Sequence, residues 1–127
     1  LYVLLSTKLI LYKNRTCIII DNKFKYEVDL IENNVSKDII AKLPLELKLN
    51  RYAEHEYSGE LQFTPTMDSK STSIVLAGHL YYWDGWNSFV INYKALDISP
   101  YILKPLVNYY SLYLLNFDYL YYFDMYS

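Results

Sequence analysis

The sequence predicts a single, mainly β domain, and three observations lead to that prediction. Residues 24–30 and 45–49 alternate apolar and polar side chains, a pattern typical of half-buried strands. Turn-forming residues separate short β-branched or aromatic runs, which is typical of hairpins. The 127 residues have room for one hydrophobic core, and the 53% hydrophobic and 20% charged fractions are close to globular averages.

The first predicted element is a hairpin over residues 16–30. Residues 16–20 form an apolar, largely β-branched run, and residues 21–23 (Asp-Asn-Lys) have turn chemistry. Residues 24–30 then place their aromatic and aliphatic side chains on one face and their charged side chains on the other. This strand is therefore expected to be half buried.

A short helix and a further strand follow this hairpin. Asn33 or Asn34 can cap a helix that runs to about Lys42, because apolar residues recur at helical spacing and Pro44 ends the pattern. Residues 45–49 alternate strictly, with three leucines expected to face inward.

The middle of the chain is less regular. Residues 50–59 are polar and predict a loop, residues 60–63 predict a short strand, and residues 67–72 predict an exposed loop. Gly78 can supply the positive φ of a tight turn.

The strongest hairpin lies near the C-terminal end. Strands are predicted at residues 80–83 and 88–93, with a turn at 84–87. Residues 102–127 then become rich in Tyr, Leu, Asn and Phe, and their spacing allows an amphipathic helix from about Leu106, although Tyr-rich strands compete with it.

Composition and the N-terminal residues argue against several classes of protein. The formal charge of -2, from 12 basic and 14 acidic residues, gives no polyanion-binding surface, so no nucleic-acid partner is expected. Cys17 is the single cysteine and lies in an apolar run, so it is expected to be a small buried side chain. Lys8 divides the apolar segment 1–15, which also lacks a signal-peptide pattern, so we expect no membrane span and a cytoplasmic location.

Two blocks resemble the bacterial cyclophilin-like domain proteins. Residues 20–28 and 41–47 are similar to the hairpin, helix end and Leu-Pro-Leu strand that open that family's domain, and residues 77–93 are similar to its Gly-led strand, tight turn and aromatic strand. The resemblance implies a small cyclophilin-like β-barrel over residues 16–101, preceded by the N-terminal apolar segment and followed by the extension at 102–127.

The resemblance also has two departures. His79 stands where the family usually has an acidic residue before the aromatic strand. The family's usual closing strand is not recognisable after Tyr101, so the barrel is expected to have an open edge, or a tail, through which the protein self-associates. The extension is either native to the chain or the product of a shifted reading frame.

The residues do not support prolyl isomerase activity. Isomerases of the cyclophilin type use an arginine on a barrel strand near a Phe and a Gln, whereas Arg15 and Arg51 lie outside any such motif. His55 and His79 could instead be metal ligands or general bases of an enzyme of unassigned reaction, with Glu54, Glu56 or Glu60 as partners. A solvated turn at residues 54–56 explains the Glu-His-Glu segment equally well. No metal-ligand or cofactor motif is present, and no cofactor is expected.

Aromatic residues are the main candidates for a ligand site. Residues 81 and 83 should face one side of their strand, and residues 80 and 82 the other, so the rings divide between the core and the barrel mouth. The predicted function is noncatalytic binding of a small molecule or peptide, with packing in the core as the alternative role of these rings. A structural module that docks through its Tyr-rich tail remains a further alternative. The candidate ligand-binding residues are Tyr52, Tyr57, Tyr82, Trp83 and Trp86.

Overall fold

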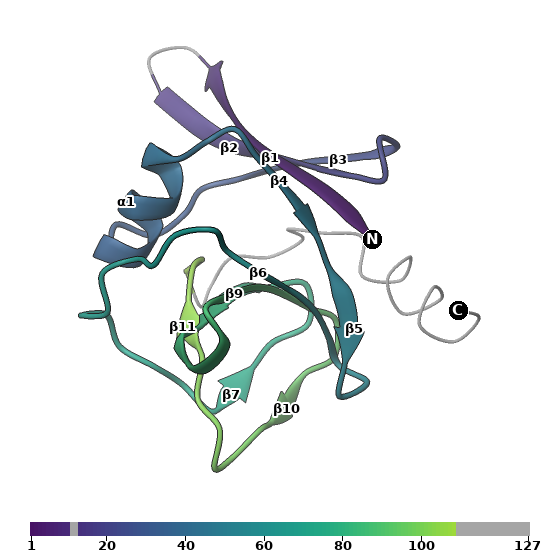
Figure 1. Ribbon diagram of the computed structural model, residues 1–127, viewed down its shortest axis with the longest axis vertical. Coiled ribbons are helices and arrows are strands. Elements are labelled where there is room, and N and C mark those ends of the chain that lie inside the picture. The colour runs from purple at the N-terminus through teal and green to yellow at the C-terminus, as the bar shows by residue number, and fades with distance from the viewer. Residues whose placement is uncertain (11–12, 109–127) are drawn as a thin grey trace.

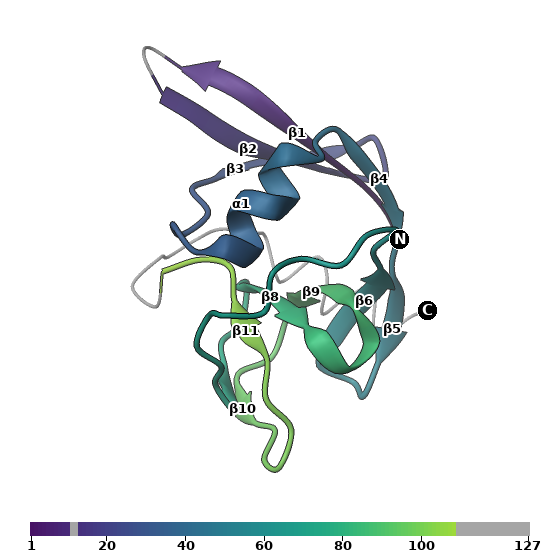
Figure 2. The same ribbon diagram turned by 60° about the vertical axis from the view of Figure 1, so that its left-hand side comes forward.

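The structure, a computed structural model, describes residues 1–10 and 13–108 and confirms the predicted mainly β class. Its strands form two larger antiparallel sheets and a separate two-stranded sheet (Figure 1). Helix α1 (Asn34–Ala41) lies at one side between the two larger sheets (Figures 1 and 2). Within the described part of the chain, no helix has the length and apolar character needed to cross a membrane.

The first sheet has the strand order β3-β2-β1-β4. Its hairpin β2–β3 confirms the first predicted hairpin, with Ile20 opposite Phe24. Asp21 and Asn22 adopt positive φ angles of 53° and 56°, which these two residue types tolerate in tight hairpin turns. The strands are β1 (Tyr2–Ile10), β2 (Lys13–Ile20), β3 (Phe24–Val28) and β4 (Leu45–Lys48).

The second sheet has the order β11-β8-β9-β6-β5, and β7 pairs with β10 beside it. Strands β8 and β9 form the predicted C-terminal hairpin, and Gly78 adopts the expected positive φ of 78°. The strands are β5 (Asn50–Tyr52), β6 (Glu56–Glu60), β7 (Ile74–Val75), β8 (Leu80–Trp83), β9 (Ser88–Asn92), β10 (Leu96–Asp97) and β11 (Lys104–Pro105).

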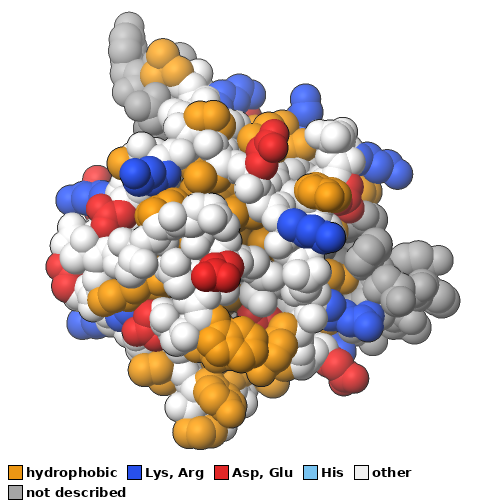
Figure 3. Space-filling view, viewed as in Figure 1, with side chains coloured by type: hydrophobic (Ala, Val, Ile, Leu, Met, Phe, Trp, Pro, Cys, Tyr) orange, Lys and Arg blue, Asp and Glu red, His pale blue; other side chains and the backbone are white. Residues whose placement is uncertain are grey.

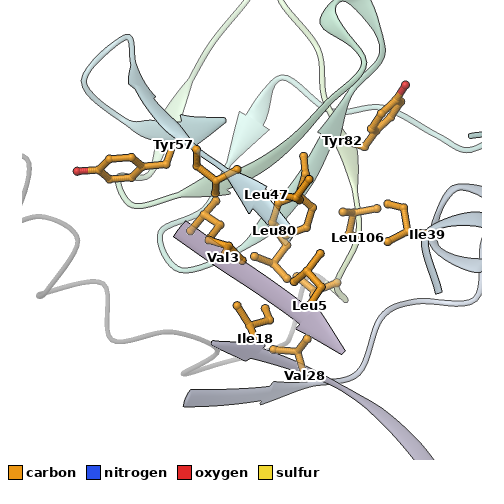
Figure 4. Close-up of a cluster of buried hydrophobic side chains, with 14 of the residues drawn as sticks. Val3, Leu5, Ile18, Val28, Ile39, Leu47, Tyr57, Leu80, Tyr82 and Leu106 are labelled. Carbon is orange, nitrogen blue, oxygen red and sulfur yellow. The ribbon is translucent and has the colours of Figure 1, made fainter. Parts of the chain in front are cut away.

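The main hydrophobic core lies between the two larger sheets and α1 (Figure 4). Strands β1, β2, β8 and β9 each contribute alternate residues to it, as the period of two requires. The second sheet also covers a smaller apolar cluster on its other face, where Tyr81 and Val90 pack with Val75 and Leu103. The main core includes Val3, Leu5, Ile18, Val28, Ile39, Leu47, Tyr57, Leu80, Tyr82 and Leu106.

Helix α1 starts at the predicted cap. The Asn33 side chain accepts a hydrogen bond from the Ser36 backbone N–H at 2.8 Å, which satisfies one of the free donors of the first turn. Val35 and Ile39 lie on the buried face of the helix. Lys42 closes its C-terminal end, close to the predicted boundary.

The prediction of a loop at residues 50–59 is wrong. Strands β5 and β6 pair antiparallel there, joined by a tight turn in which Ala53 and Glu54 have φ angles of 54° and 58°. Neither residue type signals a positive φ, so the hairpin is not visible in the sequence. His55 and Glu56 are buried rather than part of a solvated turn. The strand predicted at 60–63 ends at its first residue, Glu60.

Residues at both ends of the described chain belong to the sheets and the core, whereas the sequence analysis placed them outside the barrel. Residues 2–10 form β1 between β2 and β4, and Val3 and Leu5 are core residues. Strand β11 pairs with β8, and the next residues, Leu106 and Val107, are buried. Residues 106–108 are not helical, and the remainder of the predicted helix lies outside the described residues. Cys17 is half-buried on the outer face of β2, not fully buried as predicted.

Candidate functional site

Four aromatic side chains contact one another on the surface beside the second sheet. Trp83 stacks on Trp86, with ring centroids 4.5 Å apart and planes inclined by 23°. Tyr52 meets these two rings at 5.7 and 5.0 Å, and Tyr101 meets the Trp83 ring edge-on at 6.2 Å. We call these four residues the aromatic cluster. Figure 3 shows hydrophobic side chains gathered on the lower part of the molecule, the region of β7 and β10 in Figure 1.

The turn that presents Trp86 is fixed by hydrogen bonds. The 3₁₀ helix η1 (Asp84–Trp86) joins β8 to β9, and Asn87 follows in the left-handed conformation, at φ 47°. Its side-chain Nδ2 donates to the carbonyl oxygens of Leu61 and Phe63, and its Oδ1 accepts from the Tyr82 hydroxyl. An indole that is 53% exposed therefore stands on a well-anchored turn.

A small pocket lies beside the aromatic cluster. It has a volume of about 90 Å³, and rings of the cluster form part of its wall. The connection from β10 to β11 closes the opposite side with Ile98 and Leu103. The lining residues are Tyr52, Ala53, His55, Glu56, Trp83, Ile98, Tyr101 and Leu103.

Two buried polar side chains, His55 and Glu56, also line this pocket. Their side chains are 8% and 3% exposed, and His55 Nε2 lies 3.5 Å from Glu56 Oε1. His55 Nδ1 lies 2.8 Å from Asn92 Oδ1. Because Asn92 Nδ2 donates to two backbone carbonyls, its Oδ1 accepts, and His55 Nδ1 carries the donated proton. The neutral imidazole therefore presents Nε2 to the carboxyl group as an acceptor.

Glu56 is the electrostatically unusual group of the site. Its Oε2 is buried and has no hydrogen-bond partner among the described residues. Burial raises the pKa of Glu56 from its ordinary 4.5 to about 7, because the charged form loses its hydration. Near neutral pH this carboxyl group therefore takes up or releases a proton in response to small changes in its surroundings.

A larger groove lies on the other side of the aromatic cluster, with a volume of about 620 Å³. Tyr52 lines both the groove and the pocket, and Trp86 lines the groove. Gly59 forms part of its floor: a Cβ there would lie 2.6 Å from the Lys48 carbonyl oxygen, so no side chain fits. The other lining residues are Asn50, Arg51, Ser58, Glu60, Asp84, Gly85, Asn87 and Ser88.

The five aromatic residues proposed from the sequence separate into two groups. Tyr52, Trp83 and Trp86 lie together in the aromatic cluster. Tyr57 and Tyr82 are 2% and 0% exposed and belong to the main core, so they are packing residues rather than surface contacts. As alternation predicts, Tyr82 faces the main core, whereas Trp83 faces the opposite side of its strand.

Sequence reasoning missed Tyr101 and Asn92. Tyr101 lies 18 positions beyond Trp83 in a segment without strand or helix, and only the fold of the β10–β11 connection returns it to the cluster. Asn92 ends β9 and gave no signal of its own beyond its hydrogen-bonding capacity.

The two histidines that the sequence analysis paired, His55 and His79, do not line the same pocket. His79 is buried but does not line the pocket, and its backbone carbonyl accepts a hydrogen bond from the Asn92 N–H. Among the other carboxylates considered, Glu54 and Glu60 are exposed, and Glu56 alone lies beside the imidazole. No group of three or more His, Cys, Asp or Glu side chains within residues 1–10 and 13–108 is placed to hold a metal ion.

Fold and site together define a small β domain with an aromatic surface cluster over a half-polar pocket. A family model described as the cyclophilin-like family matches residues 18–104, and the chain belongs to that family. The match includes His55, Glu56, Trp83, Trp86 and Tyr101 but begins after β1. Searches of curated proteins and of solved structures gave no significant match.

Proposed function

We propose that this cyclophilin-like domain binds a small organic molecule, without transforming it, through Tyr52, Trp83 and Trp86. The observation that carries the proposal is the stacked Trp83–Trp86 pair, in which half-buried Trp83 lines the pocket and exposed Trp86 lines the groove. Aromatic rings supply large contact areas with few rotatable bonds, so an exposed and pre-ordered cluster binds at a low entropic cost. The hydrogen-bonded turn at Asn87 supplies that order.

The two cavities favour a small molecule over a folded protein partner. Drug-sized ligands occupy pockets of about 300 to 1,000 Å³. The groove, at about 620 Å³, falls in that range, and the adjoining pocket of about 90 Å³ accepts one small head group. A ligand that crosses the aromatic cluster would therefore place its body in the groove and its end in the pocket. A short peptide with one small terminal or side-chain group is the alternative ligand for the same surface.

The alternative of an enzyme that uses both histidines is less well supported. Joint acid–base catalysis requires both groups within hydrogen-bonding reach of one substrate. His55 lines the pocket, whereas His79 does not.

The test uses the fact that the chain contains only two tryptophans, both in the aromatic cluster. An ¹H–¹⁵N correlation spectrum of the full chain should contain two indole N–H signals, each reporting on the site. We expect members of a panel of water-soluble ring compounds at millimolar concentration to move these signals, and Trp86→Ala to weaken their binding at least tenfold.

Stability measurements separate binding from packing. The indole of Trp86 is largely exposed, so Trp86→Ala should leave the melting temperature nearly unchanged. Tyr2→Ala, which removes a ring that is 65% exposed on β1, is the matched control and should leave binding intact. If no compound moves the indole signals, or if all bind Trp86→Ala equally well, the proposal is wrong. A large loss of stability in Trp86→Ala would mark this residue as a packing residue.

A further inference from the structure

We propose that the pocket receives a protonated amine of the ligand, with Glu56 as its counter-ion and Tyr52, Trp83 and Tyr101 around the adjoining alkyl carbons. This inference rests on the proposed function, because it names the chemistry of the ligand's head group. It is carried by three observations: an unpartnered buried carboxyl oxygen, a wall of inclined aromatic rings, and the lack of a cation among the described residues that line the pocket.

The carboxyl group needs a donor that the described structure does not supply. Glu56 Oε2 is fully buried without a hydrogen-bond partner, and a buried acceptor left in that state costs free energy. Oε1 faces the imidazole of His55 at 3.5 Å, with Nε2 as the nearer nitrogen. In the neutral state, Nε2 is itself an acceptor, so an ionised Glu56 gains no hydrogen bond from it. An N–H⁺ donor at Oε2 would supply both the missing bond and the missing charge.

No lysine or arginine is among the described residues that line the pocket with Glu56. Glu56 is opposite Asn92 on β9 and Tyr52 on β5, and the β10–β11 connection contributes Ile98, Tyr101 and Leu103. The titratable groups that line the pocket with it are His55, Tyr52 and Tyr101. Arg51 on the neighbouring strand β5 is exposed, and the amine of Lys104 on β11 donates to the Ser69 carbonyl oxygen. A proton on Glu56 therefore neutralises the empty site, and an ammonium group would replace that proton.

The aromatic rings favour a cation over a neutral group. Ring faces carry a negative quadrupole that attracts cations within about 6 Å of the centroid, most strongly over Trp. The Tyr52 and Tyr101 planes are inclined to Trp83 by 51° and 67°, so the three rings form walls rather than one flat stack. A volume of about 90 Å³ admits a head group of a few heavy atoms, such as an aminomethyl group, and excludes a second ring.

The experiment compares n-butylammonium with 1-butanol, which has the same chain length and no charge. Both are titrated into the full chain at pH 8, and the two indole N–H signals are followed. We expect n-butylammonium to bind at least tenfold more tightly than 1-butanol. Glu56→Gln should remove that preference and leave 1-butanol binding unchanged. Glu46→Gln, which changes an exposed carboxylate on β4, is the matched control and should keep the preference.

A second arm of the experiment measures how binding of n-butylammonium depends on pH. Because burial raises the pKa of Glu56 to about 7, its ionised fraction increases about tenfold from pH 6 to pH 8. The affinity for n-butylammonium should increase by about the same factor, and Glu56→Gln should abolish this dependence. His55 lies 3.5 Å from Glu56, so His55→Gln is measured as well and should retain the pH dependence, because the inference assigns that dependence to Glu56.

The outcomes separate this inference from the proposed function. Equal affinities for the amine and the alcohol, or an unchanged preference in Glu56→Gln, would overturn the inference and leave aromatic binding standing. If ring compounds move the indole signals but n-butylammonium does not, the inference again fails alone. If neither ring compounds nor amines move these signals, the proposed function fails with it.

Discussion

Replacing Glu56 by Gln should make the protein more stable at alkaline pH and change it little at acidic pH. The carboxyl group is buried, one of its oxygens has no hydrogen-bond partner in the described part of the chain, and burial raises the pKa of Glu56 to about 7. Gln has nearly the same shape as protonated Glu but never ionises. The variant therefore removes the cost of burying a charge while it preserves the packing.

The sign and magnitude follow from the two protonation equilibria. In the unfolded chain this group loses its proton near its ordinary pKa of 4.5, whereas in the folded protein it keeps the proton until about 7. Between these values the folded state binds more protons, so the stability of the wild type falls as the pH rises. Each unit of difference between the folded and unfolded pKa values corresponds to 1.36 kcal/mol. The free energy of unfolding of the wild type therefore falls by about 3 kcal/mol in total. Such a difference corresponds to a change in melting temperature on the order of 10 °C for a domain of this size.

The assay is urea unfolding followed by circular dichroism at pH values from 4 to 8. The free energy of unfolding of Glu56→Gln minus that of the wild type should increase by about 3 kcal/mol across this range, most of it between pH 4.5 and 7. Groups far from residue 56 contribute equally to both proteins and cancel in this difference. His55 lies 3.5 Å from Glu56 and is therefore also replaced in a second pair of proteins. Glu46→Gln should parallel the wild type. A difference that stays constant from pH 4 to 8 would refute the reasoning.

Three further predictions concern the fold around the site. Gly59→Ala should lower the free energy of unfolding by at least about 2 kcal/mol, because its Cβ would lie 2.6 Å from the Lys48 carbonyl oxygen; an unchanged urea midpoint would contradict this. Asn87→Ala should cost about 2 to 4 kcal/mol, because two part-buried carbonyls and the Tyr82 hydroxyl lose their partner, and a cost below 1 kcal/mol in the same assay would argue against it. Asn33→Ala should cost about 1 kcal/mol through the loss of the helix cap, measured as a small fall in melting temperature; Asn33→Asp should retain most of the stability.

Most of the fold could be predicted because its local signals agree with its tertiary pairing. Asp21 and Asn22 are residues that tolerate positive φ, so the first hairpin was visible from its turn as well as from its alternation. Asn33 similarly marked the helix start. The β5–β6 hairpin lacked both signals, because Ala53 and Glu54 are not typical of a positive-φ turn. Tertiary packing imposes that turn, and such a constraint does not appear in local sequence.

The site was only partly predictable for a related reason. Alternation correctly separated Tyr82 from Trp83, and the exposed turn of Trp86 was expected. Tyr57 looked equally suitable as a surface ring, but it lies on the face of β6 that packs in the main core. The face of a strand follows from its register, and a segment interpreted as a loop has no assigned register. Tyr101 depends on a long-range return of the chain, which pattern alone does not specify.

Glu56 occupies a buried position at which its side chain lowers the stability of the fold. A domain of this kind is stable by about 5 to 15 kcal/mol in total, so a cost of about 3 kcal/mol at alkaline pH is a considerable fraction. An apolar side chain of similar volume would avoid this cost and pack against Ile98 and Leu103 in the pocket wall. The described contacts offset little of this cost, because Oε2 has no partner among them and Oε1 has only the imidazole of His55 at 3.5 Å. Local conflicts of this kind concentrate at functional sites, where a bound group completes the interactions that the protein leaves open. A ligand ammonium would complete them here, and in that state the charge on Glu56 would stabilise the complex instead of opposing the fold.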